Sequence, residues 1–464
     1  MLVVVSDTHM SDGSTANNVH GSAFDLLGRE IVSAAAPEAK AATEVHLLLL
    51  GDIFDLVRTD WWHRNTMPAE RPWGGLLDAR TGMNQNSAAI QKQFEQIFAG
   101  ILAHECSAAM LKVLNELPAA TNLPVKVTYV LGNHDRVLAN FPSLQKMLRD
   151  KLPKIDQMEF APSFRSTRYG VSARHGHQWD DDCYALQFYN KVLRSKGQPE
   201  CCRFDPAIDR VMAIGEVVTA ELMSGLVFHT GESNAQPNQK FKDFMTEFRD
   251  VNNLRPMLDV FLWVEWFARD QLPTYKKALH SALKQALGGL LESSVAQRWD
   301  ALKKDMIVSG DLTDRLSLVH KHLGRDFDHF RKRVEGAREV GNVLNFLNRF
   351  VSHERDHYLE AVKGEEDWQS KIPSGIQYIM YGHTHRPRNV VVSADHDGGV
   401  KLYVNTGTML PLIERTEDRK AFASMTQMTM AFVYGADEDT KARRGDGPTI
   451  DVWNGIRRKA YLPV

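Results

Sequence analysis

The sequence predicts an α/β fold in which short buried strands alternate with helices and a long helical stretch interrupts the pattern. Five strand-like runs each lead directly into a loop rich in Gly, Asp, Asn or His. Segments with apolar residues at helical spacing separate several of these runs. Alternating strands and helices form layered sheets, whose ligands bind beyond the carboxyl ends of the strands. We therefore expect the functional residues in these five loops.

The strand-like runs are short and mostly apolar, as expected for buried strands that open onto loops. They cover Leu2–Val5, Val45–Leu50, Val125–Leu131, Gly170–Ala173 and Ile376–Tyr381. A helical pattern covers Ala88 to Leu117, between the second and third runs. Later segments are again strand-like and are expected to complete the sheet that begins at the N-terminus; they read VVVSA, KLYVNTG, MTMAFVYG and TIDVW.

The middle of the chain has a different character, because long helical patterns replace the strand-like runs there. We expect residues 183–371 to form a helical insertion that could cap the site. Residues 1–182 and 372–464 would then be the two parts of one core domain. Met257 to Ala268 is apolar almost all round, which predicts burial in the core of the insertion. An apolar groove for a lipid-like or nucleobase group is the alternative.

The composition restricts the classes of partner. The 58 acidic residues nearly balance 56 Lys and Arg, so there is no overall basic charge to drive nonspecific nucleic-acid binding, although a local basic patch stays open. The four cysteines form no CxxC pair, which disfavours a disulfide framework and a thiolate zinc site. No apolar run reaches the roughly 18 residues of a membrane span, and the N-terminal MLVVVSD lacks the features of a signal peptide. We expect a cytoplasmic protein without a membrane span.

The five loops carry carboxylate, amide and imidazole side chains of the kind that bind first-row divalent metals. They are Asp7, His9, Asp52, Asn133, His134, His175, His383 and His385. The set contains no thiolate, suits Mn, Fe or Zn, and is large enough for two ions. Two metals can hold the attacking and leaving oxygens of a displacement at phosphorus and activate a bridging water. The alternative, that these groups only form turns at strand ends, is less favoured because all five loops share the pattern.

In these motifs the sequence resembles the calcineurin-like metallophosphoesterase family. The family pattern DxH, GDxxD, GNH[DE], a single His after a strand and GHxH stands here, in order, as DTH, GDIFD, GNHD, RHGH and GHTH. The resemblance covers the two parts of the core domain and implies a four-layer αββα sandwich. It implies that Asp7, His9 and His385 hold a first metal, that Asp52 bridges, and that Asn133, His175 and His383 hold a second. Manganese is the first expectation for both ions.

The resemblance also implies two catalytic residues that are not ligands. His134 would protonate the leaving oxygen, and Asp55 would orient its imidazole and raise its pKa. His177 and Arg136 are further candidates for contact with the substrate. Asp180 to Asp182 are expected to cap the first helix of the insertion, where the helix dipole favours negative charge.

Within the family, the local likeness is greatest to UDP-2,3-diacylglucosamine hydrolases, which resemble this chain in GDIFD, HGHQWDDDCYALQFYNK and GHTHRP. That likeness would predict Arg where this chain has His134, and HGD where it has HGH. We therefore expect the reaction class and not the lipid substrate.

The expected function is hydrolysis of a phosphodiester, pyrophosphate or phosphomonoester by a metal-bridging hydroxide, with specificity set by the insertion and by the Trp-rich loop from Arg58 to Gly75. Two alternatives remain. A nuclease requires a basic track beside the metals. A non-catalytic interaction module on the same fold predicts lost ligands.

Overall fold

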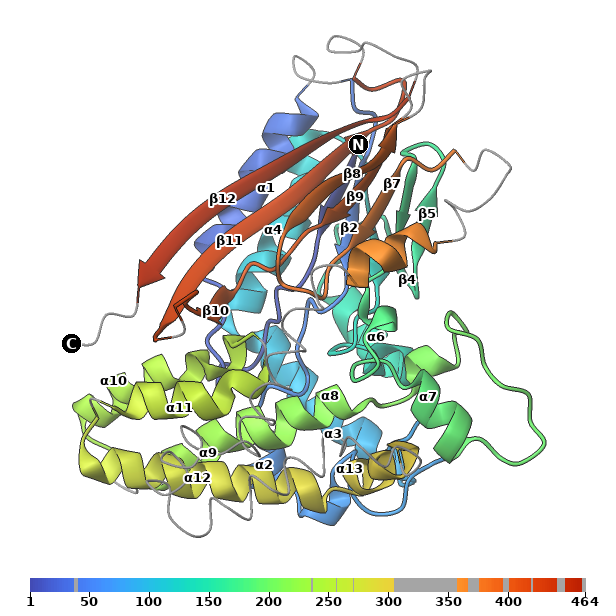
Figure 1. Ribbon diagram of the computed structural model, residues 1–464. Coiled ribbons are helices and arrows are strands. Elements are labelled where there is room, and N and C mark those ends of the chain that lie inside the picture. The colour runs from blue at the N-terminus through green and yellow to red at the C-terminus, as the bar shows by residue number, and fades with distance from the viewer. Residues whose placement is uncertain are drawn as a thin grey trace.

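The computed structural model contains two mixed β-sheets, with helices around them and a mostly helical region at one end (Figure 1). The structure describes residues 1–36, 41–234, 237–255, 257–269, 271–303, 357–365, 375–394, 400–418, 420–439 and 447–460. The α/β class expected from the sequence is confirmed.

The larger sheet has seven strands and combines both ends of the chain. Its parallel part consists of β1 (Leu2–Val5), β2 (Val45–Leu50), β3 (Val125–Val130) and β4 (Gln157–Ala161). Strand β11 (Phe422–Tyr434) pairs antiparallel with β1 and β10 (Pro411–Arg415) along one edge and with β12 (Thr449–Ala460) along the other. The C-terminal strands therefore complete the N-terminal sheet, as predicted.

The smaller sheet has five strands in the order β5-β6-β7-β9-β8. They are β5 (Phe164–Ser166), β6 (Val171–Ala173), β7 (Tyr378–Tyr381), β9 (Val400–Asn405) and β8 (Arg388–Ala394). Strands β6, β7 and β9 are parallel, so the strands before RHGH and GHTH end at the same edge.

Apolar side chains fill the space on both faces of the larger sheet. Leu2 and Val4 of β1 belong to a cluster that also contains Val171 and Met380 of the smaller sheet, so this cluster joins the two sheets. The alternate residue Val3 belongs to a second cluster, shared with helices α1, α3 and α4. A third cluster joins the smaller sheet to the helical residues 357–363. Burial on both faces explains why the sequence of β1, LVVV, does not alternate with polar residues.

The helices of the core domain follow the expected pattern with one correction. They are α1 (Ser22–Ala35), α2 (Trp61–Asn65), η1 (Pro68–Glu70), α3 (Ser87–Ala103), α4 (Glu105–Thr121), α5 (Val137–Asn140), α6 (Pro142–Asp150) and η2 (His177–Trp179). The pattern from Ala88 to Leu117 is not one helix, because the chain breaks at His104 and bends by 72°. His104 is extended, and its imidazole accepts a hydrogen bond from the Cys106 N–H, which starts α4.

Residues 183–303 contain helices and no strand among their described positions, in agreement with a helical insertion. The elements are α7 (Leu186–Phe188), η3 (Tyr189–Leu193), η4 (Ile208–Arg210), α8 (Ile214–Val217), η5 (Val218–Ser224), α9 (Gly225–Glu232), α10 (Gln239–Phe248), η6 (Arg249–Asn253), η7 (Met257–Asp259), α11 (Val260–Ala268), α12 (Pro273–Glu292), α13 (Ser294–Trp299) and η8 (Asp300–Lys303). The predicted residues 304–356 and 366–371 of the insertion lie outside the described part of the chain.

Helix α11 is buried, as its apolar sequence predicts. Trp263 and Phe267 stack at 4.6 Å between ring centroids, and Phe248 of α10 packs against both. These rings belong to the same apolar cluster as Val3 of the larger sheet, so the insertion shares its core with the core domain. Figure 1 shows helices α8 to α12 at the end of the sheets opposite the N-terminus.

One stretch of the described chain, Ile208–Glu232, has the length and hydropathy of a membrane-spanning helix. Within its most apolar window, 94% of the residues are buried inside the protein, which is typical of a core helix in a soluble protein. The bent pair Ser87–Ala103 and Glu105–Thr121 passes the same test only if both helices are taken together.

Two buried acids on this apolar stretch connect the insertion to the core domain. Glu216 pairs with Arg136 at 2.6 Å, and Glu221 accepts hydrogen bonds from Arg71 and Trp73, both at 2.5 Å. The Trp-rich loop is therefore packed against the insertion. Its His63 stacks on Phe228 of α9, with ring centroids 5.1 Å apart.

We expect Glu221→Leu to lower the free energy of unfolding by about 3–5 kcal/mol, because it leaves the buried Arg71 charge without its partner. Urea unfolding followed by tryptophan fluorescence measures this. Glu232→Leu is the control: Glu232 and its partner Arg64 are 53% and 50% exposed, so the expected change is about 1 kcal/mol or less. Equal free energies of unfolding for the two variants would show that the contacts of Glu221 do not hold the insertion to the core domain.

Candidate metal centre

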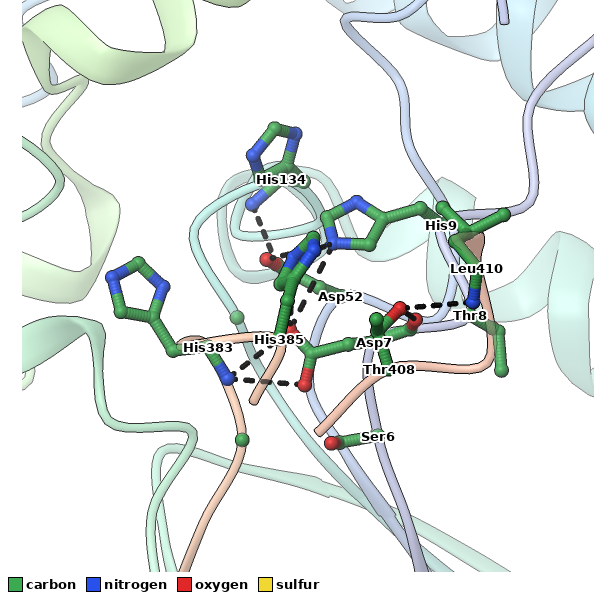
Figure 2. Close-up of polar contacts among 12 residues, drawn as sticks. Ser6, Asp7, Thr8, His9, Asp52, His134, His383, His385, Thr408 and Leu410 are labelled. Carbon is green, nitrogen blue, oxygen red and sulfur yellow. Dashed lines mark hydrogen bonds and ion pairs between the residues drawn. The ribbon is translucent and has the colours of Figure 1, made fainter. Parts of the chain in front are cut away.

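The five predicted loops meet at one place, because each follows the carboxyl end of a parallel strand: β1, β2, β3, β6 or β7. Figure 2 shows the imidazoles of His9, His134, His383 and His385 around the carboxylates of Asp7 and Asp52. The structure thus brings together residues that are up to 378 positions apart in the sequence, from Asp7 to His385.

The first group contains Asp7, His9 and His385, whose candidate ligand atoms all lie within 4.8 Å of one another. Nε2 of His9 lies 2.9 Å from Nε2 of His385, and Nε2 of His385 lies 3.5 Å from Oδ1 of Asp7. All three residues are buried. This is the set that the sequence assigns to a first metal.

The second group contains Asp52, His175 and His383, again within 4.8 Å. Nε2 of His175 lies 3.1 Å from Oδ2 of Asp52, and Nδ1 of His175 donates a hydrogen bond to the Leu50 carbonyl at 2.9 Å. That hydrogen bond fixes the ring and directs Nε2 toward the carboxylate. Asp52 also lies 3.7 Å from His9 of the first group, as a bridging residue must.

The buried atoms of this site fit metal ligation. Oδ1 of Asn133 is buried and has no hydrogen-bond partner among the described residues, and the buried Nε2 of His175 faces the carboxylates of Asp52 and Asp7. Burial lowers the pKa of His175, but the carboxylates of Asp52 and Asp7 outweigh it and raise this pKa to about 10. The centre therefore favours a positive charge at the point where the predicted ligands converge. Histidine, aspartate and asparagine side chains suit first-row divalent cations.

Non-glycine residues with a positive φ are concentrated at the site. The described part of the chain has six non-glycine residues with positive φ: Asp7, His9, Asp52, Asn122, His383 and His385. Five of the six are predicted ligands. Such conformations are unfavourable for residues with a Cβ and concentrate where function requires a particular side-chain direction.

Glycines beside the ligands allow the backbone to approach them closely. A Cβ at Gly132 would lie 2.1 Å from Oδ1 of Asp52, and one at Gly382 would lie 2.2 Å from Oδ2 of Asp7. A larger residue at Gly132 of GNHD or Gly382 of GHTH would therefore collide with a predicted ligand from another loop.

We expect Gly132→Ala to weaken metal binding by about 10- to 100-fold, as is typical when the support of a ligand is disturbed. The added methyl group must displace the Asp52 carboxylate. Gly100→Ala is the matched control, because a Cβ there meets no atom within 4 Å on α3. Isothermal titration with Mn²⁺ compares the two. If Gly132→Ala bound Mn²⁺ as tightly as Gly100→Ala, Asp52 would not be a ligand.

Asp55 and His134 are in direct contact, as the sequence predicts. Nδ1 of His134 lies 2.8 Å from Oδ2 of Asp55. Burial lowers the pKa of His134, but the carboxylates of Asp55 and Asp52 outweigh it and the pKa is raised. The raised pKa favours the protonated imidazole that a proton donor requires.

Asp55 has two further partners that the sequence did not indicate. Its Oδ2 lies 2.8 Å from Nδ1 of His9 and 3.0 Å from Nε of the fully buried Arg58. Asp55 therefore orients a predicted metal ligand and the predicted acid at the same time. His9, Asp55 and His134 also lie close enough together to form a third possible ligand group.

Asp135, the last residue of GNHD, was not predicted to have a role. Its carboxylate accepts hydrogen bonds from the Tyr129 hydroxyl at 2.6 Å, from the Gly132 N–H at 2.7 Å and from the Ile53 N–H at 3.0 Å. It thereby ties the GNHD loop to the GDIFD loop. Its place in the GNHD motif was the one available signal.

The two predicted substrate contacts are both buried at the border between the centre and the insertion. The ring of His177 lies 5.4 Å from that of His175, and burial holds its pKa well below the ordinary value. Arg136 donates to Glu216 of α8 at 2.6 Å and to the Arg210 carbonyl at 3.1 Å. Contact of either residue with a substrate stays a prediction.

The expectation for Asp180 to Asp182 is wrong. Helix α7 begins after Ala185 without a side-chain cap. The Asp180 carboxylate instead accepts the N–H groups of Asp182 and Cys183, and its Oδ2 lies 3.2 Å from Nε2 of His383. The chain turns here before any helix of the insertion starts. Asp180 thus lies beside one of the two ring nitrogens of the candidate ligand His383.

A cavity of about 450 Å³ adjoins the first group. Its walls include His385, Arg386, Arg388, Leu410, Leu412 and Met425. Arg386 pairs with Glu414 at 2.5 Å. The cavity therefore lies beside the candidate ligand His385, between β8, β10 and β11, and part of its lining is apolar.

The sequence has been compared with known families and with curated proteins. No family model matches it, and no curated protein matches it.

Proposed function

We propose that the chain is a dinuclear-metal-dependent phosphoesterase of the calcineurin-like type. The observation that carries this proposal is the convergence of two ligand groups, Asp7-His9-His385 and Asp52-His175-His383, on one buried centre. The sequence motifs support it, because all five expected strand-end loops take part. Two sheets that share an apolar core, with helices on the outer faces, are compatible with the four-layer sandwich of that family.

The residues divide the chemistry between them. Two divalent cations, with Mn first and Fe or Zn as alternatives, would supply Lewis acidity and an activated water for attack at phosphorus. Asp52 is the candidate bridge, because it lies within 3.7 Å of His9 and 3.1 Å of His175. Asn133 completes the second group with its buried Oδ1.

His134 is the candidate proton donor to the leaving oxygen. Its Nδ1 is held by Asp55, which leaves Nε2 as the nitrogen that can carry a proton to the substrate. The Asp55 charge stabilises the protonated ring. Since Asp55 also holds His9, the donor and the first ligand group have a fixed relative position.

The proposal is tested with purified protein on a phosphodiester, a phosphomonoester and single-stranded DNA, each with and without Mn²⁺. We expect Mn²⁺-dependent hydrolysis of at least one small ester. Preference for DNA would favour the nuclease alternative. No hydrolysis of any substrate by metal-loaded protein would favour the interaction module.

A further inference from the structure

Arg255, a residue of the insertion, reaches the first ligand group. Its Nη2 lies 3.0 Å from Nδ1 and 3.1 Å from Nε2 of His385. On its other side, Nη1 donates to the carbonyls of Leu254 at 2.7 Å and Asn252 at 3.4 Å. No motif in the sequence marks this arginine.

The segment that carries Arg255 is firmly attached to the core domain. The Arg255 N–H donates to the Ile413 carbonyl of β10 at 2.9 Å, and Leu254 forms a β-bridge with the same residue. Asn252 donates to the Thr15 carbonyl at 2.9 Å, and both Asn252 and Leu254 are buried. The backbone at Arg255 is therefore fixed against the core domain, and it places the guanidinium beside the candidate metal centre.

Ligation changes what His385 can offer to this guanidinium. A neutral imidazole has one nitrogen with a lone pair and one N–H. When His385 gives its lone pair to a metal, its other nitrogen is an N–H donor and cannot accept from Arg255. The Nη2–H groups of Arg255 then lie beside a metal-bound imidazole as positively charged donors, and His385 also borders the cavity of about 450 Å³.

We propose that Arg255 binds a non-bridging phosphate oxygen of the substrate and is the residue through which the insertion takes part in substrate binding. A planar guanidinium matches the geometry and charge of a phosphate better than any other side chain. The inference rests on the proposed function, because it needs a phosphate on the metals. Arg255 would add an anion-binding group that comes from outside the five loops.

Inorganic phosphate is the probe, bound to Mn²⁺-loaded protein and measured by calorimetry. We expect Arg255→Met to weaken phosphate binding by about 10- to 100-fold, as for the loss of a hydrogen bond between charged groups. The same variant should bind Mn²⁺ as tightly as the wild type or more tightly, because no ligand is removed. Arg255→Lys should recover part of the phosphate affinity. Arg149→Met, at an exposed arginine in the last turn of α6, is the control and should leave both affinities unchanged.

Two results would overturn the inference. Unchanged phosphate affinity in Arg255→Met would exclude contact with phosphate, and a parallel loss of Mn²⁺ would make Arg255 a support of the metal ligands instead. Either result leaves the proposed function intact if the wild type binds Mn²⁺ and hydrolyses a phosphoester. If the wild type does neither, the proposed function fails and this inference fails with it.

Discussion

Asp52→Asn is expected to remove both metal binding and phosphoesterase activity. Asp52 lies near both groups, 3.7 Å from His9 and 3.1 Å from His175. The charges of His175 and His134 outweigh the effect of burial and hold its pKa well below the ordinary value, so the wild type offers a charged ligand. An amide has no such charge to bridge two cations.

The substitution is chosen so that the fold survives. Oδ1 of Asp52 accepts the His134 N–H at 2.8 Å, and an asparagine Oδ1 can accept the same hydrogen bond. We expect the affinity for Mn²⁺ to fall by more than the roughly 10- to 100-fold of an indirect change. Asp150→Asn, at the exposed end of α6, is the control. A folded Asp52→Asn protein that still bound two Mn²⁺ ions would exclude Asp52 as the bridge.

His134→Asn is expected to lower turnover by about 10²- to 10⁴-fold and to leave metal binding unchanged. The reason is geometric: His134 contacts Asp55 and not the carboxylates of Asp7 or Asp52 through its ring. The loss should be greater for an alkyl ester than for a p-nitrophenyl ester, because p-nitrophenolate leaves without protonation. Comparing the two substrates therefore tests proton donation itself.

The same variant decides between two roles for His134. His9, Asp55 and His134 form a possible ligand group. If His134→Asn lost an ion together with activity, His134 would be a ligand and not the proton donor. If both esters were affected equally, His134 would stabilise charge and not donate a proton.

The sequence predicted the strands and the candidate ligands well because both depend on local patterns. Runs such as Val45–Leu50 are apolar at all positions but one, and β2 has these bounds in the structure. Each run ends in polar residues, and parallel strands bring such ends to one edge. The strand β10 was missed because Pro411–Arg415 has only two buried positions, and the break at His104 was missed because the helical pattern continues through it.

The rest of the site depends on contacts between distant segments, which no local pattern shows. Arg255 lies 130 positions from His385, and Glu216 lies 80 positions from Arg136. Asp180 was assigned to a helix cap because acids often precede helices, whereas its contact with His383 spans 203 positions. The meeting of the candidate ligands could thus be predicted from the sequence, but the groups that contact them from distant segments could not.

The central claim is that the five strand-end loops form a two-metal centre that hydrolyses phosphoesters. The most direct measurement is a titration of chelator-treated protein with Mn²⁺, in which bound metal and hydrolysis of bis(p-nitrophenyl) phosphate are followed together. We expect no activity before the titration, and we expect activity to saturate when two Mn²⁺ ions are bound per chain. Activity that survives the chelator, or a chain that binds no Mn²⁺, would contradict the central claim.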